Sequence, residues 1–510
     1  MFIAGIAKNE RELFTRLVSA MTGGSTVGRY VVAGTGNGQL HGLELPISLF
    51  NTAIVLTCTL TTANSAEFSV TVGGAGAPTA KTYEAYNYNG LNFMVGVGST
   101  AWQVGDTITI AAQGSSSVPV DAEVYLETTA GSIEEDLTLT CTGASTAGAG
   151  AIFNVSGSVS GLIGVVYQGA RTELTGHTFT ILDGVDFSVS DNIVYPLRAS
   201  ELPVAQRWEV LEKDLGVMRF DGEEAGHEGI TRIAMRGRGN TGNENIYAQF
   251  RHWGLIDRYV NWAFTGFTGW TDGIDHTLQQ GYIPAIEQPA ITMKHELISF
   301  YISITGRRVM GVVGSGEVYN HFYVGLLQGH QAPTHYPYPM FVGGSNIPYA
   351  LDDDLEGDTG YYQKQVAVHS AYWNPVVYTG GTNPTSQAAV YTFNDTYEPV
   401  GGKQVANTLS TGLNSTDYNN VRYGVAPFSF FGMSRLRANF DGTYTPVPVW
   451  LSSHTDSMKA VLGRFDGLTA VSSDNGQQAG NVMEADGNYH IVFNNVFRQS
   501  ANDFCMIEVK

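Results

Sequence analysis

The stretch Ile298-Ser-Phe-Tyr-Ile-Ser-Ile-Thr-Gly-Arg-Arg-Val-Met-Gly-Val-Val313 decides the fold of this chain. Polar and apolar side chains alternate from Ser299 to Ile304, and this period of two predicts a β-strand with one face in a core. Gly306 gives the backbone freedom that a short hairpin loop needs before residues 309–313 return as a second strand. The stretch therefore predicts an antiparallel hairpin and a chain that is mainly β.

Composition extends this prediction to the whole chain. The 510 residues are 43% hydrophobic and include 61 glycines, but only 15% are charged, which favours many short strands joined by turns. At about 100 to 200 residues per domain, the chain is multidomain. Its net charge of -20 repels phosphate backbones, so we expect no nucleic-acid partner.

The small number of cysteines and the lack of long apolar runs indicate the compartment in which the chain is assembled. Cys58, Cys141 and Cys505 are too few for a disulfide framework, so we expect buried free thiols and assembly in a reducing cytoplasm. The first residues lack a basic start followed by an apolar core, and no run of about 18 apolar residues occurs. We therefore expect neither Sec export nor membrane insertion.

One short N-terminal helix is predicted from Glu10 to Met21. Asn9 can cap its first turn, and Glu12 stands three residues later, as in a capping box. Its apolar face consists of Phe14, Leu17, Val18 and Met21, which need a core supplied by the residues after Arg207. The glycine-rich stretch 34–38 lacks the spacing of a dinucleotide loop and predicts a turn, not a nucleotide site.

An internal repeat lies between the helix and the rest of the chain. Leu56-Thr-Cys-Thr59 recurs as Leu139-Thr-Cys-Thr142, and Phe68 corresponds to Phe153. We therefore predict that residues 50–115 and 134–197 form two small antiparallel β-modules of the same strand order. The predicted domains are 1–45, packing with the body; 46–120, module 1; 121–200, module 2; and 201–510, a β-sandwich-like body into which both modules are inserted.

Motifs that follow the hairpin carry a resemblance to a known family. After the Gly-Arg-Arg turn come Tyr319-Asn-His-Phe-Tyr-Val-Gly-Leu-Leu327 and His335-Tyr-Pro-Tyr-Pro-Met-Phe-Val-Gly-Gly-Ser345. In this order they resemble a family of structural proteins found in the virions of tailed bacteriophages. Further segments that fit lie at 245–250, 259–267, 436–444, 463–472 and 492–498, so the likeness covers most of 206–510 and a short N-terminal piece.

The resemblance implies a virion component of the tail, baseplate or neck-associated appendages that acts by assembly and not as an enzyme. The chain would be made in the host's bacterial cytoplasm, and its partners would be copies of itself and other virion proteins. We expect a homo-oligomer of three-fold or six-fold symmetry held by the body, with the acidic modules projecting outward. The candidate assembly or recognition residues are Tyr336, Tyr338, Phe341 and Trp373.

Metal binding and sugar chemistry are the alternatives. Asp352, Asp354 and Glu356 match the first half of a calcium loop, but its twelfth position is Gln363, so calcium competes with a solvated acidic loop. His321, His330 and His335 do not have helix-face spacing and are interpreted as structural. A host-surface glycan-binding or glycan-degrading tail fibre or tailspike would need paired carboxylates, for which the candidates are Asp272 with Asp275 and Asp456 with Asp466.

Overall fold

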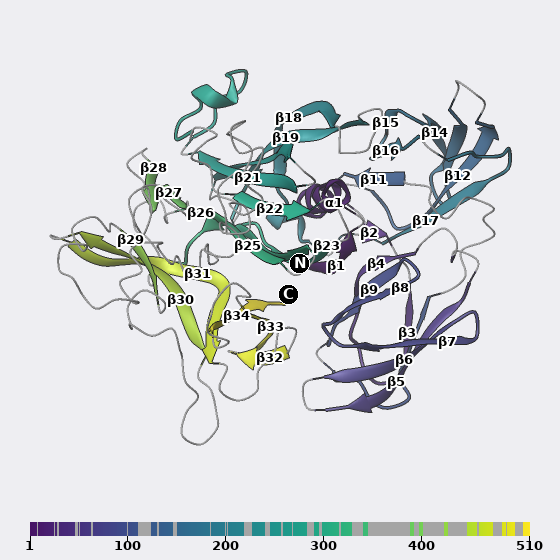
Figure 1. Cartoon of the computed structure of the whole chain (residues 1–510), viewed down its shortest axis with the longest axis horizontal. Coiled ribbons are helices and arrows are strands. Elements are labelled where there is room, and N and C mark those ends of the chain that lie inside the picture. Colours follow the sequence, from purple (N-terminus) through teal and green to yellow (C-terminus); the bar gives the residue numbers. More distant parts are fainter. Residues whose placement is uncertain are drawn as a thin grey trace.

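A computed structural model of the chain is mainly β, and one α-helix occurs among the residues that it describes. The described residues are 1–7, 9–24, 26–27, 30–45, 49, 52–62, 65–98, 100–110, 124–129, 132–145, 150–183, 185–198, 200, 202–218, 227–239, 245–256, 259–267, 269–282, 290–294, 298–315, 318–328, 340–344, 388–391, 397–400, 423–426, 446–455, 458–472, 482–485, 487–494 and 503–509. Figure 1 shows the modules on one side of the body and the C-terminal strands on the other.

The predicted hairpin lies within a sheet that we call the central sheet, with the strand order β1-β23-β24-β25-β26-β27-β28. The hairpin strands pair antiparallel, with Ile304 opposite Val309. An N-terminal strand, which the sequence did not reveal, pairs with β23 so that Ile3 lies opposite Ile302. The strands are β1 (Phe2–Ala7), β23 (Ile298–Ile304), β24 (Arg308–Ser315), β25 (Val318–Leu326), β26 (Met340–Gly344), β27 (Ala388–Tyr391) and β28 (Tyr397–Val400).

Both faces of the central sheet are buried around β23, which corrects the prediction of a single buried face. Phe300 and Ile302 face one core, whereas Tyr301 faces a second core together with Met310. Ser303 is also fully buried on this second side. The two serines of β23 made the second face look solvent-exposed, but the sheet is the middle layer of the body.

Two further sheets cover the central sheet. The first, which we call the helix-side sheet, has the order β18-β19-β20-β21-β22, and the second, the C-terminal sheet, has the order β29-β30-β31-β34-β33-β32. Their strands are β18 (Glu209–Met218), β19 (His227–Gly237), β20 (Ile246–Ile256), β21 (Tyr259–Phe267), β22 (Ala290–Lys294), β29 (Tyr423–Ala426), β30 (Val447–Thr455), β31 (Met458–Ser472), β32 (Val482–Ala485), β33 (Asn488–Asn494) and β34 (Asp503–Glu508). Short 3₁₀ turns lie at Val204–Gln206 and His276–Leu278.

The helix α1 (Glu10–Thr22) forms as predicted and packs on the body. The Asn9 side chain accepts a hydrogen bond from the Glu12 amide at 3.1 Å, and Gly23 ends the helix with a φ of 77°. Phe14 meets Trp262 of β21 edge-on, with ring centroids 5.3 Å apart. The helix therefore belongs to the core between the helix-side and central sheets.

The two modules have the same strand order, as expected of two copies of one module. Module 1 pairs a sheet β3-β10-β5-β6-β7 with a sheet β4-β9-β8, and module 2 pairs β2-β17-β12-β13-β14 with β11-β16-β15. Module 1 consists of β3 (Val31–Ala33), β4 (Leu40–Glu44), β5 (Ile54–Thr61), β6 (Ala66–Val72), β7 (Ala75–Lys81), β8 (Ala85–Tyr88), β9 (Leu91–Val95) and β10 (Thr107–Ile110). Module 2 consists of β2 (Thr26–Val27), β11 (Val124–Thr128), β12 (Asp136–Gly143), β13 (Ile152–Gly157), β14 (Gly161–Tyr167), β15 (Arg171–Leu174), β16 (His177–Ile181) and β17 (Asn192–Arg198).

Equivalent aromatic pairs fill the equivalent positions of the modules. Phe68 packs edge-on against Trp102 at 5.2 Å, and Phe153 packs edge-on against Phe187 at 4.9 Å. Cys58 and Cys141 are buried thiols at matching positions of the two modules, and Cys505, elsewhere in the chain, is buried too.

The boundary that we predicted at residue 46 cuts through the modules. Strands β3 and β4 precede it and belong to module 1, while β2 pairs with β17 of module 2. The chain leaves the body after α1 and returns near Leu202, whose side chain joins the body core. The insertion therefore spans about 25–201, and the segment that packs with the body ends at Gly24.

Candidate functional site

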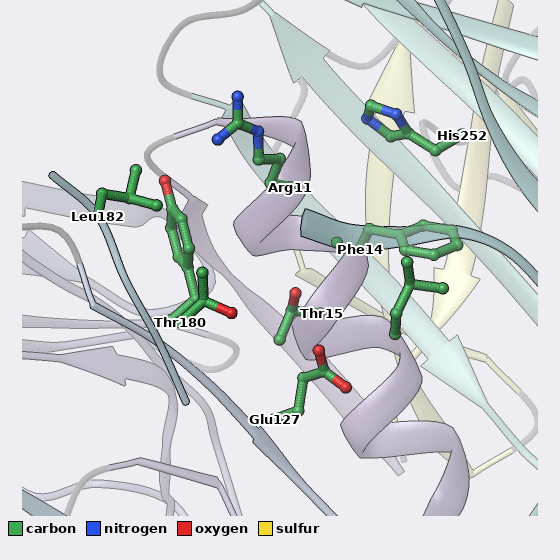
Figure 2. Close-up of a pocket in the computed structure, with 10 residues that line it drawn as sticks. Arg11, Phe14, Thr15, Glu127, Thr180, Leu182 and His252 are labelled. Atoms are coloured by element: carbon green, nitrogen blue, oxygen red, sulfur yellow. The ribbon is translucent and has the colours of Figure 1, made fainter. Parts of the chain in front are cut away.

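A pocket lies where α1, module 2 and the helix-side sheet meet, and we call it the junction pocket. Its space not occupied by atoms amounts to about 400 Å³, part of it open to solvent. The lining residues are Arg11, Phe14, Thr15, Tyr125, Glu127, Thr180, Leu182, Gly229, Ile230 and His252. Figure 2 shows Thr180 and Leu182 of the module on one side of the helix and His252 of the body on the other.

Local structure explains why these side chains converge. Residues 11, 14 and 15 share one face of α1 because a helix repeats every 3.6 residues. Tyr125 and Glu127 are two residues apart on β11, so their side chains lie on the same face of the strand. Tyr125 lies opposite Thr180 of β16. The Asn9 side chain, which caps the helix, also donates a hydrogen bond to the Tyr125 hydroxyl at 3.0 Å. A single residue thus begins the helix and attaches it to module 2.

A chain of charges continues from the pocket to the body. Glu127 Oε2 lies 3.0 Å from Nη2 of Arg171, Arg171 Nη1 lies 2.6 Å from Oε1 of Glu173, and Lys213 Nζ of β18 lies 3.4 Å from the same Glu173 oxygen. Burial lowers the pKa of Arg171, but the neighbouring carboxylates outweigh it, and the net direction is upward. The hydrogen bond from Arg171 and the charge of Lys213 lower the pKa of Glu173. The module and the body are therefore connected by a continuous series of ion pairs.

A buried carboxylate lies next to His252, outside the pocket lining. Glu10 has no exposed surface, and its Oε1 lies 3.8 Å from Nε2 of His252 on β20. The His252 ring also meets Phe14 edge-on, with centroids 6.2 Å apart. The helix N-terminus is therefore attached to β20 as well as to module 2.

The chemistry open to this lining is limited. Glu127 is its one carboxylate, and it is bound by Arg171 in a bidentate arrangement. Glycoside hydrolysis needs two carboxylates flanking the bond to be broken. The junction pocket lies where three parts of the molecule meet, and among the described residues its lining supplies one of the two carboxylates that this reaction needs.

The Gly-Arg-Arg turn supplies a second polar cluster, in the body interior. The Arg308 side chain is completely buried, with Nε 3.6 Å from Asp466 of β31 and Nη2 3.8 Å from Glu508 of β34. Gln328 Nε2 donates to Asp466 at 2.7 Å. Gly467 has a φ of +72°, and any Cβ there would collide with the Arg308 guanidinium. The turn of the hairpin thereby carries a cation into the seam between the central and C-terminal sheets.

The structure describes one of the predicted site residues, Phe341, and not the others. Phe341 is a core side chain and not a contact residue, because it is fully buried on β26 with its ring 4.8 Å from that of Phe465. The other candidates lie outside the described residues: Tyr336, Tyr338, Trp373, Asp352, Asp354 and Glu356. Among the residues that are described, no group of three or more His, Cys, Asp or Glu could hold a metal ion.

The structure describes only some members of the predicted histidine and carboxylate sets. His321 is buried on β25, where desolvation lowers its pKa to about 3, while His330 and His335 are not described. Asp275 caps a 3₁₀ turn, and hydrogen bonds from Thr277 lower its pKa, which is the wrong direction for a general acid. Asp466 pairs with Arg308, and Asp456 is not described.

The glycine-rich loop at 34–38 holds an internal carboxylate. Asp106 accepts hydrogen bonds from the amides of Thr35 and Gly36, both at 2.8 Å, and from that of Gln103 at 2.7 Å. A Cβ on Gly34 would collide with this carboxylate. The loop amides that could have bound a phosphate are therefore used within module 1.

Sequence reasoning missed the junction pocket. Glu127 and Arg171 were visible only as charges in an acidic region, and the capping role of Asn9 did not reveal its second partner, Tyr125. The one available signal was the two-residue spacing of Tyr125 and Glu127, which places both side chains on one face of a strand. None of the helices in the described residues is long and apolar enough to cross a membrane.

No protein-family model matches the chain, and a search of curated proteins finds no match.

Proposed function

We propose that this protein is a structural component of a tailed-phage virion, in the tail, the baseplate or a neck-associated appendage, and that it acts through assembly contacts. The order of its motifs around the Gly-Arg-Arg turn supports this proposal. So does the architecture, because a body of three stacked sheets carries two copies of one module on the same side (Figure 1).

The observation that carries the proposal is that charged side chains join separate parts of the fold to one another. Arg308 joins the central and C-terminal sheets, and the Glu127–Arg171–Glu173–Lys213 chain joins module 2 to the body. Enzymes concentrate such groups in a pocket where they face a substrate. Here they join layers, as expected of a protein whose task is to hold its shape.

Glycan binding or cleavage is the weaker alternative. Of its predicted carboxylates, Asp275 caps a turn and Asp466 pairs with a buried arginine. The half-buried Trp270 packs edge-on against Phe267 at 5.2 Å, as a core aromatic does.

A particle experiment tests the proposal. Virions are purified from infected cells, their proteins are identified by mass spectrometry, and a cryo-EM reconstruction locates this chain. We expect a fixed number of copies per particle, arranged with three-fold or six-fold symmetry and contacting other virion proteins. A chain present in infected cells but absent from purified particles would contradict the proposal.

A further inference from the structure

The two modules offer an internal comparison, because the same strand pairing carries different side chains. Phe68 and Phe153 occupy equivalent positions opposite Cys58 and Cys141. One residue earlier in β6 and in β13, module 1 has Glu67 paired with Lys81, and module 2 has Ile152 paired with Tyr167. A charged cross-strand pair in one module is thus an apolar pair in the other.

The exposure of these pairs shows that neither belongs to a core. Lys81 Nζ lies 3.4 Å from Glu67 Oε1, and the two side chains are 47% and 37% exposed. Ile152 and Tyr167 are 37% and 49% exposed. Opposite charges are an ordinary choice for such a solvent-facing pair, whereas two large apolar side chains at the same site leave hydrophobic surface in water.

The apolar surface continues along the hairpin of β13 and β14. Leu162 is 73% exposed and occupies the position that Gly76 has in module 1, as their partners Ser156 and Thr71 show. Val165 comes directly before the buried Val166, just as Thr79 of module 1 comes directly before the buried Ala80. Val159, in the turn of the hairpin, is also exposed. We call these side chains the hairpin patch: Ile152, Val159, Leu162, Val165 and Tyr167.

The sheet edge beside the patch is also unprotected. Among the described strands, β14 hydrogen-bonds to β13 alone and so ends its sheet, as β7 ends the sheet of module 1. Strand β7 carries Pro78 and Lys81, two residue types that block the addition of a further strand. Strand β14 reads Gly-Leu-Ile-Gly-Val-Val-Tyr and has neither. It lies at the outer margin of the molecule (Figure 1).

Folding does not require this surface. Module 1 reaches the same strand order with Glu67, Gly76, Thr79 and Lys81 at the corresponding positions. Exposed apolar clusters that the fold does not need are characteristic of contact surfaces.

The absence of charged residues around the hairpin patch indicates which kind of partner binds to it. No Asp, Glu, Lys or Arg occurs from Gly143 to Ala170, although the whole chain has a net charge of -20. Two copies of so acidic a chain repel each other unless they meet at a neutral surface, and an apolar neutral patch is complementary to itself across a two-fold axis. A basic partner would find no carboxylate within this segment.

We propose that the hairpin patch is a self-association surface, occupied by the β13–β14 hairpin of a second copy of this chain. This assigns to module 2 a contact that the sequence had led us to expect from the body. The proposal does not depend on the virion role, because self-association is measured on the purified chain.

The test transfers the module 1 pair into module 2. The double variant Ile152→Glu, Tyr167→Lys reproduces a pair that this scaffold already accepts. Self-association of the full chain is followed by sedimentation velocity and mass photometry over a wide concentration range. We expect concentration-dependent association of the natural chain, and a dissociation constant raised about tenfold or more in the variant, because truncating central apolar contacts has effects of this size.

A second variant and a matched control make the result decisive. Leu162→Lys changes the most exposed member of the patch and is expected to weaken association while leaving the urea midpoint unchanged. The exchange Glu67→Lys, Lys81→Glu keeps the module 1 pair and the net charge, so association should not change. A natural chain that stays monomeric at every concentration, or folded variants that associate as it does, would overturn the proposal.

Discussion

At the scale of single residues, buried charged side chains hold separate segments of the fold together. Asp106 closes a loop of module 1 with amide hydrogen bonds, and Arg308 places a guanidinium between two sheets. Removing one partner of such a group leaves the other desolvated, which costs more than the contact itself contributes.

Asp106→Asn is expected to destabilise module 1 by about 1.5–3 kcal/mol at neutral pH, the range for hydrogen bonds to a charged group. Burial raises the pKa of Asp106, but the amides of Gln103, Thr35 and Gly36 outweigh it, so the pKa lies below its ordinary value. The contribution is therefore complete above the unfolded pKa of about 4 and is lost as the pH falls through the lower folded pKa.

Urea unfolding between pH 7 and pH 3 measures this effect. The difference between the natural chain and Asp106→Asn should shrink in the acid range, while the exposed control Asp272→Asn stays within about 0.5 kcal/mol throughout. A difference that is constant across the whole pH range would contradict the assigned role.

Arg308→Met is expected to cost about 3–5 kcal/mol, because it leaves Asp466 and Glu508 in the seam without the cation between them. The control Arg238→Ala removes an arginine that is 44% exposed and pairs with Glu209, where a loss of at most about 1 kcal/mol is expected. Chemical denaturation gives both values. Equal effects of the two substitutions would show that Arg308 does not fasten the sheets.

At the scale of elements, the central sheet is distinguished by having a packed core on each of its two faces. Strand β1 shows this: Phe2 faces the core shared with the C-terminal sheet, whereas Ile3 faces the core shared with α1. A strand at the edge of an ordinary surface sheet would bury only one of the two.

Phe2→Ala and Ile3→Ala are both expected to destabilise the protein, by about 2–5 kcal/mol each, since both side chains leave cavities in packed cores. Val31→Ala, at a side chain that is 66% exposed on β3, should change the unfolding free energy by about 0.5 kcal/mol or less. Urea midpoints of the three variants check this. A near-neutral result at either Phe2 or Ile3 would mean that one face of β1 is open.

At the scale of the whole molecule, the modules form an insertion whose ends meet. The Trp208 amide donates to the Met21 carbonyl at 2.8 Å, and the Arg207 Nε donates to the Leu202 carbonyl at 3.3 Å. The chain thus leaves and re-enters the body at neighbouring points, the arrangement in which an inserted domain is tolerated.

Deleting 25–201 and joining the ends with a short Gly-Ser linker should leave a body that unfolds in one cooperative transition. Its midpoint should be lower than that of the full chain, because Tyr83 and Met94 of the module region contribute to a body core. Deleting only 46–200 leaves β2, β3 and β4 without their pairing partners and should fold poorly. Circular dichroism during urea titration separates these outcomes, and equal behaviour of the two deletions would refute the boundaries.

The sequence by itself determined the elements whose signals are local. A period of two identified the first strand of the hairpin at Ile298–Ile304, a capped 3.6-residue period identified α1, and repeated spacings identified the modules. The first two signals depend on a few neighbouring residues, and the third on the comparison of two stretches of sequence, so none of them requires knowledge of tertiary contacts.

Only the tertiary structure decided what those elements contact. The pairing of β1 with β23, the burial of Phe341 and Arg308, and the junction pocket each join segments that are far apart in the sequence. No local pattern specifies such contacts, because the same strand can lie at a surface or between two layers. Arg308 and Glu127 acquire their roles only because other parts of the chain pack around them.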